Sequence, residues 1–126
     1  MKLGAYLVTM MLAAGLSGPM VRTAQAVEAP FETRLIRLAE ILGSLHYLRN
    51  LCGEQSNQWR DEMETLLATE NPEPATRARY VSGFNNGYRS FGSAYNSCTQ
   101  SAQLAAERYR KEGEALARDI AVRYGN

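Results

Sequence analysis

The sequence predicts an all-α protein: a small antiparallel four-helix bundle of up-down-up-down topology with one disulfide, preceded by a cleavable signal peptide. Three observations support this fold class. Apolar residues recur at helical spacing in four segments, which short stretches rich in Gly, Pro, Asn and Ser separate. The two cysteines come directly after the first and the third segment. Four helices joined by short loops favour an antiparallel bundle.

Residues 1–26 are typical of a secretory signal peptide. Lys2 gives the start a positive charge, and residues 3–16 form an apolar stretch. Ala24 and Ala26 then supply the small side chains that signal peptidase requires before its cut. We therefore expect cleavage after Ala26.

A membrane anchor is the alternative to a cleaved signal. A spanning helix needs about 20 apolar residues, whereas this run covers only residues 3–16 before glycines and a proline interrupt it. We expect no membrane span after cleavage, export through the general secretory pathway to the periplasm, and a single domain over residues 27–126.

The charge balance excludes one class of partner. The chain has 14 Lys+Arg and 13 Asp+Glu. Removing Lys2 and Arg22 with the signal leaves 12 basic and 13 acidic residues, a net charge of −1. A nucleic-acid-binding domain needs a basic excess, so no nucleic-acid partner is expected.

The first helix is predicted over about residues 31–50, after a short lead that ends at Pro30. Apolar residues at spacings of three and four indicate one buried face. These residues are Phe31, Leu35, Leu38, Leu42 and Leu45, with Ile36, Ile41 and Leu48 widening the stripe. Gly53 follows as a terminator.

The second helix is predicted over about residues 57–69. Ser56 and Asn57 offer an N-cap. The inner face contains Trp59, Met63 and either Leu66 or Leu67. The helix ends before Pro72, because the residue before a proline is disfavoured in helical conformation.

The third helix is predicted over about residues 74–96 and carries two neighbouring stripes. One is aromatic and apolar: Val81, Phe84, Tyr88, Phe91 and Tyr95. The other is small: Gly83, Gly87, Ser90 and Ala94. A glycine costs a helix about 1 kcal/mol relative to alanine, so two glycines four apart need a packing reason. The sequence leaves open whether this small stripe packs within the bundle or against a second copy.

The fourth helix is predicted over about residues 101–124, after a short turn with a capping hydroxyl. One side of this helix is apolar or small: Ala102, Ala105, Tyr109, Gly113, Leu116, Ile120 and Tyr124. The other side has opposite charges four residues apart, which is typical of a solvated face.

A disulfide between Cys52 and Cys98 is predicted for an oxidising compartment. Closing a loop of this length would stabilise the fold by about 4 kcal/mol in the chain-entropy model. In an up-down-up-down bundle the ends of the first and third helices lie at the same end, so disulfide and topology support each other. Free thiols or an intermolecular bridge are the alternatives.

No catalytic or metal-binding pattern is present. His46 is the only histidine, and the chain lacks a nucleophile motif and the spacing of a zinc site. Haem ligation by His46 and Met63 is an alternative, although the chain lacks the Cys-x-x-Cys-His attachment motif. We expect a non-enzymatic protein without a cofactor, in which His46 is partly buried and hydrogen-bonded.

The segment from Gly83 to Arg89 is the most unusual stretch. Asn85 and Asn86 are poor helix formers, and Tyr88 and Arg89 are residue types favoured at interface anchors. We interpret these four residues as candidates for partner binding. Arg60, which is next to Trp59, is a similar candidate. Exposed amides or hydrogen bonds across the bundle would explain the asparagines equally well.

Several blocks together resemble a family of small exported proteins of alphaproteobacteria whose function is unknown. These blocks are Leu38–Arg49, Leu51-Cys52-Gly53, Trp59–Met63, Gly83–Arg89 and Tyr95-x-x-Cys98. The resemblance covers nearly all of the predicted mature chain and implies a periplasmic setting but no reaction. It also implies that His46, Trp59, Arg60, Asn85, Tyr88 and Arg89 are signature residues of the family, for packing or for binding.

These features together predict a periplasmic helical protein that acts by binding, as an accessory factor of cell-envelope or cell-wall machinery. Its partner would be an envelope protein or peptidoglycan. A small-ligand carrier with a cavity near His46, Trp59 and Tyr88 is one alternative. A cell-wall hydrolase that uses His46 or Glu62 is the other. The oligomeric state is open.

Overall fold

The computed structural model describes residues 23–125, with side chains from residue 30 onward. This part of the chain is all-α, as predicted, and contains no strand. Its helices are α1 (Thr23–Leu51), α2 (Gln58–Glu70), α3 (Pro74–Ala94) and α4 (Gln100–Tyr124). Most of the predicted signal peptide lies outside the described residues.

The helix bounds agree with the predicted ones within two residues, except at the start of α1. This helix begins at Thr23 rather than near residue 31, so it continues through Pro30 and the predicted lead over 27–30 is helical. The residues before Pro30 include several good helix formers, among them Ala24, Ala26 and Ala29. These favour a helix although an interior proline disfavours one.

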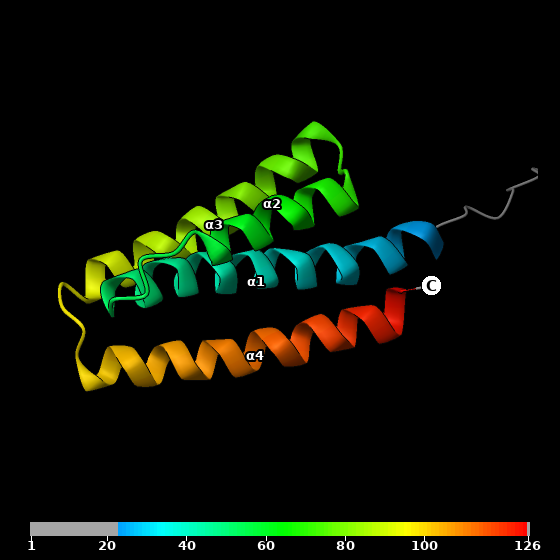
Figure 1. The fold of residues 1–126 in the computed structure, drawn as a ribbon. Coiled ribbons are helices and arrows are strands. Elements are labelled where there is room, and N and C mark those ends of the chain that lie inside the picture. Colours follow the sequence, from blue (N-terminus) through cyan, green and yellow to red (C-terminus); the bar gives the residue numbers. More distant parts are fainter. Residues whose placement is uncertain (1–22, 126) are drawn as a thin grey trace, which may run out of the picture.

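Helix α1 lies at the centre, and each of the other three helices packs against it. Figure 1 shows the chain direction reversing from each helix to the next, so that α1 and α3 run the same way. The arrangement departs from the predicted bundle in one respect. In a regular bundle of this topology the first and third helices lie diagonally opposite each other, whereas here α1 and α3 form the most extensive helix pair.

Small residues explain how α1 and α3 come so close. A Cβ on Gly83 would lie 3.1 Å from the Ile36 carbonyl oxygen. A Cβ on Gly87 would overlap the Glu40 carbonyl oxygen. On α1, Gly43 faces the Phe84 carbonyl in the same way. The small stripe of α3 therefore packs within the chain in its first half, which answers the question that the sequence left open.

The two helices keep one register along their length. Four pairs of facing residues are separated by 46 or 47 positions in the chain. The pairs are Glu32 with Arg79, Ile36 with Gly83, Glu40 with Gly87, and Cys52 with Cys98. A constant offset is what two parallel helices in contact require.

The core has two parts, which lie on different faces of α1. One contains Leu35, Ala39, Leu42, Met63, Leu67 and Tyr80, where α2 and α3 meet α1. The other contains Ile41, Leu45, Leu48, Ala102, Ala105 and Ala106, where α4 meets α1. Helix α1 is thus buried on more than the single face that its spacing indicated. On α2, Leu67 is buried and Leu66 only partly so.

Ion pairs connect α4 to α1 beside this second core. Arg37 donates two hydrogen bonds of 2.9 Å to the Glu112 carboxylate, and Arg34 pairs with Asp119. Only some charges of α4 pair along the helix as predicted, such as Arg110 with Glu114 and Arg123 with Asp119. The predicted solvated face is therefore partly an interhelical one.

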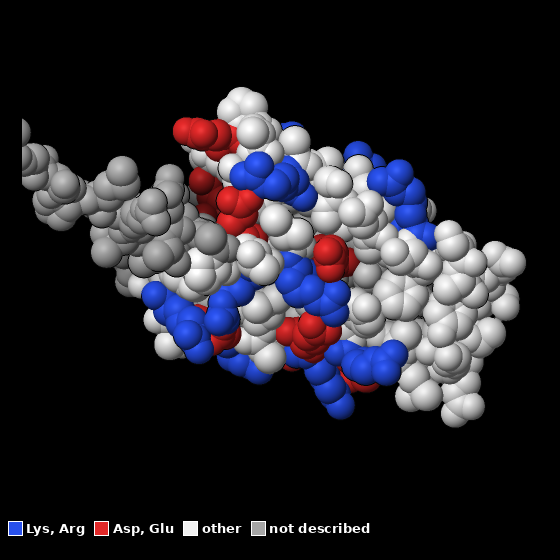
Figure 2. Space-filling view, turned by 180° about the vertical axis from the view of Figure 1, so that it is seen from behind, with Lys and Arg blue, Asp and Glu red and all other residues white. Residues whose placement is uncertain are grey.

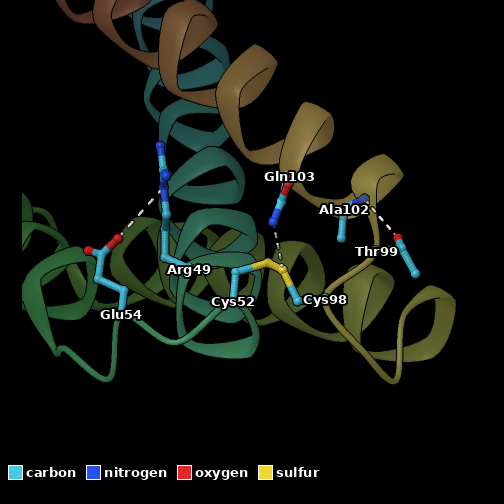
Figure 3. Close-up of a disulfide and its surroundings, with 7 residues drawn as sticks. All are labelled: Arg49, Cys52, Glu54, Cys98, Thr99, Ala102 and Gln103. Atoms are coloured by element: carbon cyan, nitrogen blue, oxygen red, sulfur yellow. Dashed lines mark hydrogen bonds and ion pairs between the residues drawn. A yellow bond between two sulfur atoms is a disulfide. The ribbon is translucent and has the colours of Figure 1, made fainter.

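The predicted disulfide is present and joins the ends of α1 and α3 (Figure 3). Cys52 and Cys98 have their Cα atoms 4.9 Å apart. Next to it, the Thr99 hydroxyl accepts a hydrogen bond from the Ala102 backbone N–H at 3.1 Å and caps α4. The predicted capping hydroxyl is thus that of Thr99.

Candidate functional site

A groove between α2 and α3, floored by α1, collects four of the sequence-predicted binding residues. We call it the His46 groove, and its volume is about 430 Å³. Its lining comprises His46 of α1, Arg60, Met63, Glu64 and Leu67 of α2, and Arg77, Val81, Phe84, Asn85 and Tyr88 of α3. The predicted residues His46, Arg60, Asn85 and Tyr88 therefore share one surface although three different helices carry them.

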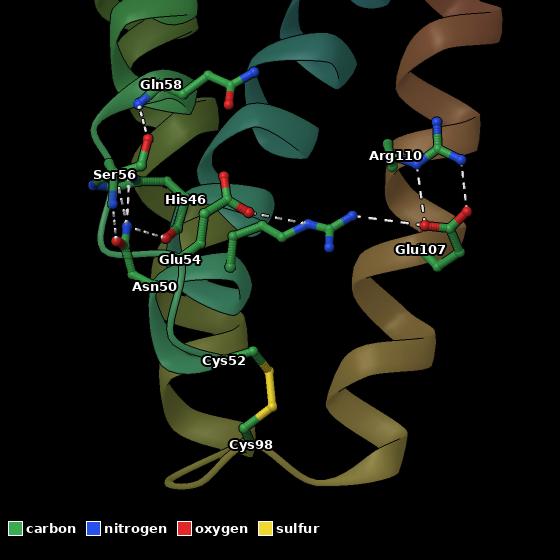
Figure 4. A network of polar contacts seen from close by, with 10 residues as sticks. His46, Asn50, Cys52, Glu54, Ser56, Gln58, Cys98, Glu107 and Arg110 are labelled. Carbon is green, nitrogen blue, oxygen red and sulfur yellow. Dashed lines mark hydrogen bonds and ion pairs between the residues drawn. A yellow bond between two sulfur atoms is a disulfide. The ribbon is translucent and has the colours of Figure 1, made fainter.

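A hydrogen-bond network fixes His46 at the edge of this groove (Figure 4). The side-chain oxygen of Asn50 accepts from the Ser56 backbone N–H at 2.8 Å. Because that N–H can only donate, the amide nitrogen of Asn50 faces the other way, 3.2 Å from His46 Nδ1. His46 Nδ1 is therefore an acceptor, and in the neutral ring Nε2 carries the proton.

The surroundings of His46 favour this neutral form. Burial lowers the pKa of His46 from its ordinary value, and the positive charge of Arg60 lowers it further. The Asp61 carboxylate opposes the change with a smaller effect. At neutral pH the ring thus offers a hydrogen bond rather than a positive charge.

The positive charge of the groove comes from two arginines instead. Arg60 and Arg77 are exposed, and neither forms an ion pair with any residue in the described range 30–125. In contrast, ion pairs hold six other arginines: Arg34, Arg37, Arg49, Arg79, Arg110 and Arg123. Glu64 is the one carboxylate in the lining. The groove can therefore accept an anionic group.

Aromatic side chains form one wall of the groove. The Tyr88 ring is 41% exposed, and its centroid lies 5.7 Å from that of His46. Tyr47 contacts Tyr88 edge to face at 5.3 Å, which holds the ring in place. Phe84 lies 5.9 Å from His46. A rigid, half-exposed tyrosine is a surface on which a sugar or peptide group can stack.

The remaining predicted residues lie elsewhere. Asn86 lines a small pocket with Arg37, Ser44 and Tyr109, on the side where α4 packs. Arg89 is exposed outside the His46 groove, and its Nε donates to the Asn85 carbonyl oxygen at 3.3 Å. Asn85 and Asn86 are thus not one site, because adjacent helical residues point in different directions.

One end of the molecule has no charged side chains on the face that Figure 2 shows. Basic and acidic side chains are mixed over the rest of this face, while the end farthest from the grey residues has none. The sequence agrees, since residues 90–106 contain no Lys, Arg, Asp or Glu. This end includes the disulfide and the loop between α3 and α4.

A second and larger groove, of about 710 Å³, lies between α2 and α4, and we call it the Trp59 groove. Its lining comprises Leu38, Ile41, Leu42, Leu45 and Arg49 of α1, Glu54, Gln58, Trp59, Glu62, Thr65, Leu66, Thr69 and Glu70 in and before α2, and Arg110, Gly113, Glu114 and Ala117 of α4. Sequence reasoning missed it, because its leucines have the spacing of an ordinary core stripe.

The two grooves separate residues that the alternative predictions combined. Trp59 and Glu62 line the Trp59 groove, while His46 and Tyr88 line the other. The cavity predicted near His46, Trp59 and Tyr88 is therefore two surfaces. Met63 lines the His46 groove but is only 4% exposed, in the core beside Leu35.

Two features are absent from the part of the chain that the structure describes. No group of three or more His, Cys, Asp or Glu side chains could hold a metal ion. None of the helices has the length and apolar character needed to cross a membrane.

Comparisons with known proteins identify the family. Curated proteins and solved structures gave no match to the chain. Residues 30–124 match a family model, and this range includes both grooves and the disulfide. The chain therefore belongs to the family described as "Protein of unknown function (DUF2385)".

Proposed function

We propose that this protein is an exported binding protein that recognises a carboxylate-bearing peptide of the cell envelope through the His46 groove. The peptides of peptidoglycan are the first ligands to test. The observation that carries the proposal is the pair Arg60 and Arg77, two guanidinium groups without ion-pair partners in the described chain that line one groove.

The other groups of the groove support a peptide or glycopeptide ligand. A guanidinium binds a carboxylate through two parallel hydrogen bonds. Asn85 and the Nε2–H of His46 add polar groups that suit peptide amides. The half-exposed ring of Tyr88 adds a stacking surface. The proposed function is binding, which the charges, hydrogen-bond donors and rings of the lining support.

Soluble peptidoglycan fragments test the ligand, with binding measured by calorimetry. We expect the combined replacements Arg60→Ala and Arg77→Ala to weaken binding at least tenfold, and added salt to weaken it in the wild type. Arg108→Ala with Arg118→Ala is the matched control, since these exposed arginines lie on α4. Fragments that bind both double variants equally, or that do not bind the wild type, would refute the proposal.

Export is the second part of the proposal, and the signal-like segment supports it. Cleavage after Ala26 would make α1 begin at Val27. Pro30 would then lie in the first turn, where backbone N–H groups have no acceptor within the helix, so the N–H that proline lacks would cost no hydrogen bond. Mass spectrometry of the protein from the periplasmic fraction of the native host should give a chain that begins at Val27. An intact chain found only in the cytoplasm would contradict export.

A further inference from the structure

We propose that the Trp59 groove binds an extended peptide segment of a partner protein, with apolar side chains and at least one Lys or Arg. This site is separate from the His46 groove and does not depend on the ligand proposed for it. The size of the Trp59 groove and its charge both support this occupant.

The shape and floor of the groove suit an extended chain. Its volume of about 710 Å³ lies in the range of about 300–1,000 Å³ typical of ligand sites. The floor residues Ile41 and Leu45 are at most 2% exposed, and Leu42 is 8% exposed. The groove is therefore narrow at its base. Single side chains fit such a base better than a helix of about 10 Å diameter.

Two buried hydrogen-bond donors in this lining lack acceptors. They are Trp59 Nε1 and Arg49 Nε, each of which exposes less than 1 Å². Within the described residues they are the only buried side-chain polar atoms without a hydrogen bond. Arg49 has only loose ion pairs, at 3.7 Å to Glu54 and 3.6 Å to Glu107.

Leaving a buried donor unpaired costs roughly 1–3 kcal/mol, so native proteins satisfy nearly all such groups. Both residues belong to one groove lining, but atoms that expose less than 1 Å² are out of reach of an occupant of the open groove. The size and the charge of the groove therefore select the occupant.

The charge of the rim selects among possible ligands. Four carboxylates and two guanidiniums line the groove. Glu54 and Glu114 pair with Arg49 and Arg110, whereas Glu62 and Glu70 have no ion pair among the described residues. The excess of negative charge favours a Lys or Arg side chain on the occupant and disfavours a fatty acid or an acidic peptide.

The test uses a short peptide of leucine, serine and lysine, acetylated and amidated, with a fluorescent label for anisotropy. Trp59 is the only tryptophan of the chain, so its emission reports directly on the groove. We expect binding and a blue shift of the Trp59 emission, because the occupant removes water from the half-buried ring. The same peptide with glutamate in place of lysine should bind at least tenfold more weakly.

Variants of the exposed rim locate the site without disturbing the core. Ala117→Trp should block the groove and abolish binding. Glu62→Lys should weaken binding about fivefold, while Glu64→Lys, which lies on the other side of α2, should leave it unchanged.

The opposite results would overturn the proposal. These are no binding of the lysine peptide, equal affinity for the glutamate peptide or for palmitate, or binding that survives Ala117→Trp. Arg60→Ala with Arg77→Ala should leave this binding unchanged. That outcome separates the Trp59 groove from the His46 groove, so either proposal can fail alone.

Discussion

The Cα of Gly87 on α3 lies directly against the backbone carbonyl of Glu40 on α1. A Cβ at this position would overlap the carbonyl oxygen and lie 2.8 Å from Ser44 Oγ. Ser44 is itself 2% exposed, and its hydroxyl donates to the same carbonyl at 2.7 Å. The two helix backbones therefore meet here without side chains between them.

Replacing Gly87 by alanine should destabilise the protein. The clash involves a backbone carbonyl, which cannot rotate away as a side chain can. Overpacking of this kind costs about 1–3 kcal/mol, and the better helix propensity of alanine offsets about 1 kcal/mol of it. The difference is about 0–2 kcal/mol, and because backbone atoms must move apart we expect a net loss near the upper end of that range in the free energy of unfolding, measured by urea denaturation.

Gly92 provides the matched control on the same helix. A Cβ there would lie 3.5 Å from the Tyr47 ring, an ordinary contact distance. Gly92→Ala should therefore stabilise the protein, by up to about 1 kcal/mol. Equal effects of the two replacements would show that the contact at Glu40 does not control the packing of α1 on α3.

Removing the disulfide should also lower stability, because the unfolded chain without it has more conformational entropy. Cys52 and Cys98 close a loop with a sequence separation of 46 residues. Cys52→Ser with Cys98→Ser should reduce the free energy of unfolding by about 2–4 kcal/mol. Far-UV circular dichroism of the folded variant should be unchanged, because the register of α1 and α3 also rests on the glycine contacts. A variant as stable as the wild type would contradict this.

Helix periodicity was enough to predict the four helices, because apolar spacing and proline positions are local signals. It could not show that α1 is central. Leu35 and Ile41 belong to different core clusters, yet both belong to one widened stripe in the sequence. The small stripe at Gly83 and Gly87 indicated that another backbone comes close to this helix. It did not indicate which helix provides that backbone, because the choice depends on the tertiary packing.

The candidate site was predictable only in part for the same reason. Residue type alone indicates His46, Arg60, Asn85 and Tyr88, and the packing of α2 and α3 on α1 brings them together. Asn86 and Arg89 are neighbours of these residues in the sequence, but the rotation of the helix places them outside the groove. The Trp59 groove depends on where α2 and α4 lie around α1, which no local pattern specifies.

Loss of the Thr99 hydroxyl should weaken the start of α4. This hydroxyl accepts from the Ala102 backbone N–H at 3.1 Å. Thr99→Ala should cost about 1 kcal/mol of stability. Asn57, the N-cap residue of α2, makes no side-chain capping bond. Asn57→Ala should therefore have a smaller effect in the same denaturation experiment, and a larger effect would contradict the assigned caps.

Titration of His46 should make the protein less stable in mild acid. Burial, and then the charge of Arg60, lower the pKa of His46 in the folded state. The unfolded chain, whose histidine has its ordinary pKa of about 6.5, therefore binds a proton at a higher pH than the folded chain does. The free energy of unfolding must then fall with pH below about 6.5, until the folded state also becomes protonated.

A comparison with His46→Gln isolates this effect from other titrating groups, because glutamine keeps a hydrogen-bond acceptor for Asn50 but does not titrate in this range. The stability difference between wild type and variant should be constant above about pH 7.5 and should shrink as the pH falls to 5.

Protonation of His46 puts a hydrogen on Nδ1, 3.2 Å from the Asn50 amide nitrogen, which already donates to the His46 and Ser56 carbonyl oxygens. That amide cannot turn without giving up the Ser56 bond, so protonation of His46 should also loosen the loop that follows α1. Faster hydrogen exchange at the Ser56 amide at pH 5 than in His46→Gln, corrected for intrinsic rates, would demonstrate this link. Equal protection in the two proteins would contradict it.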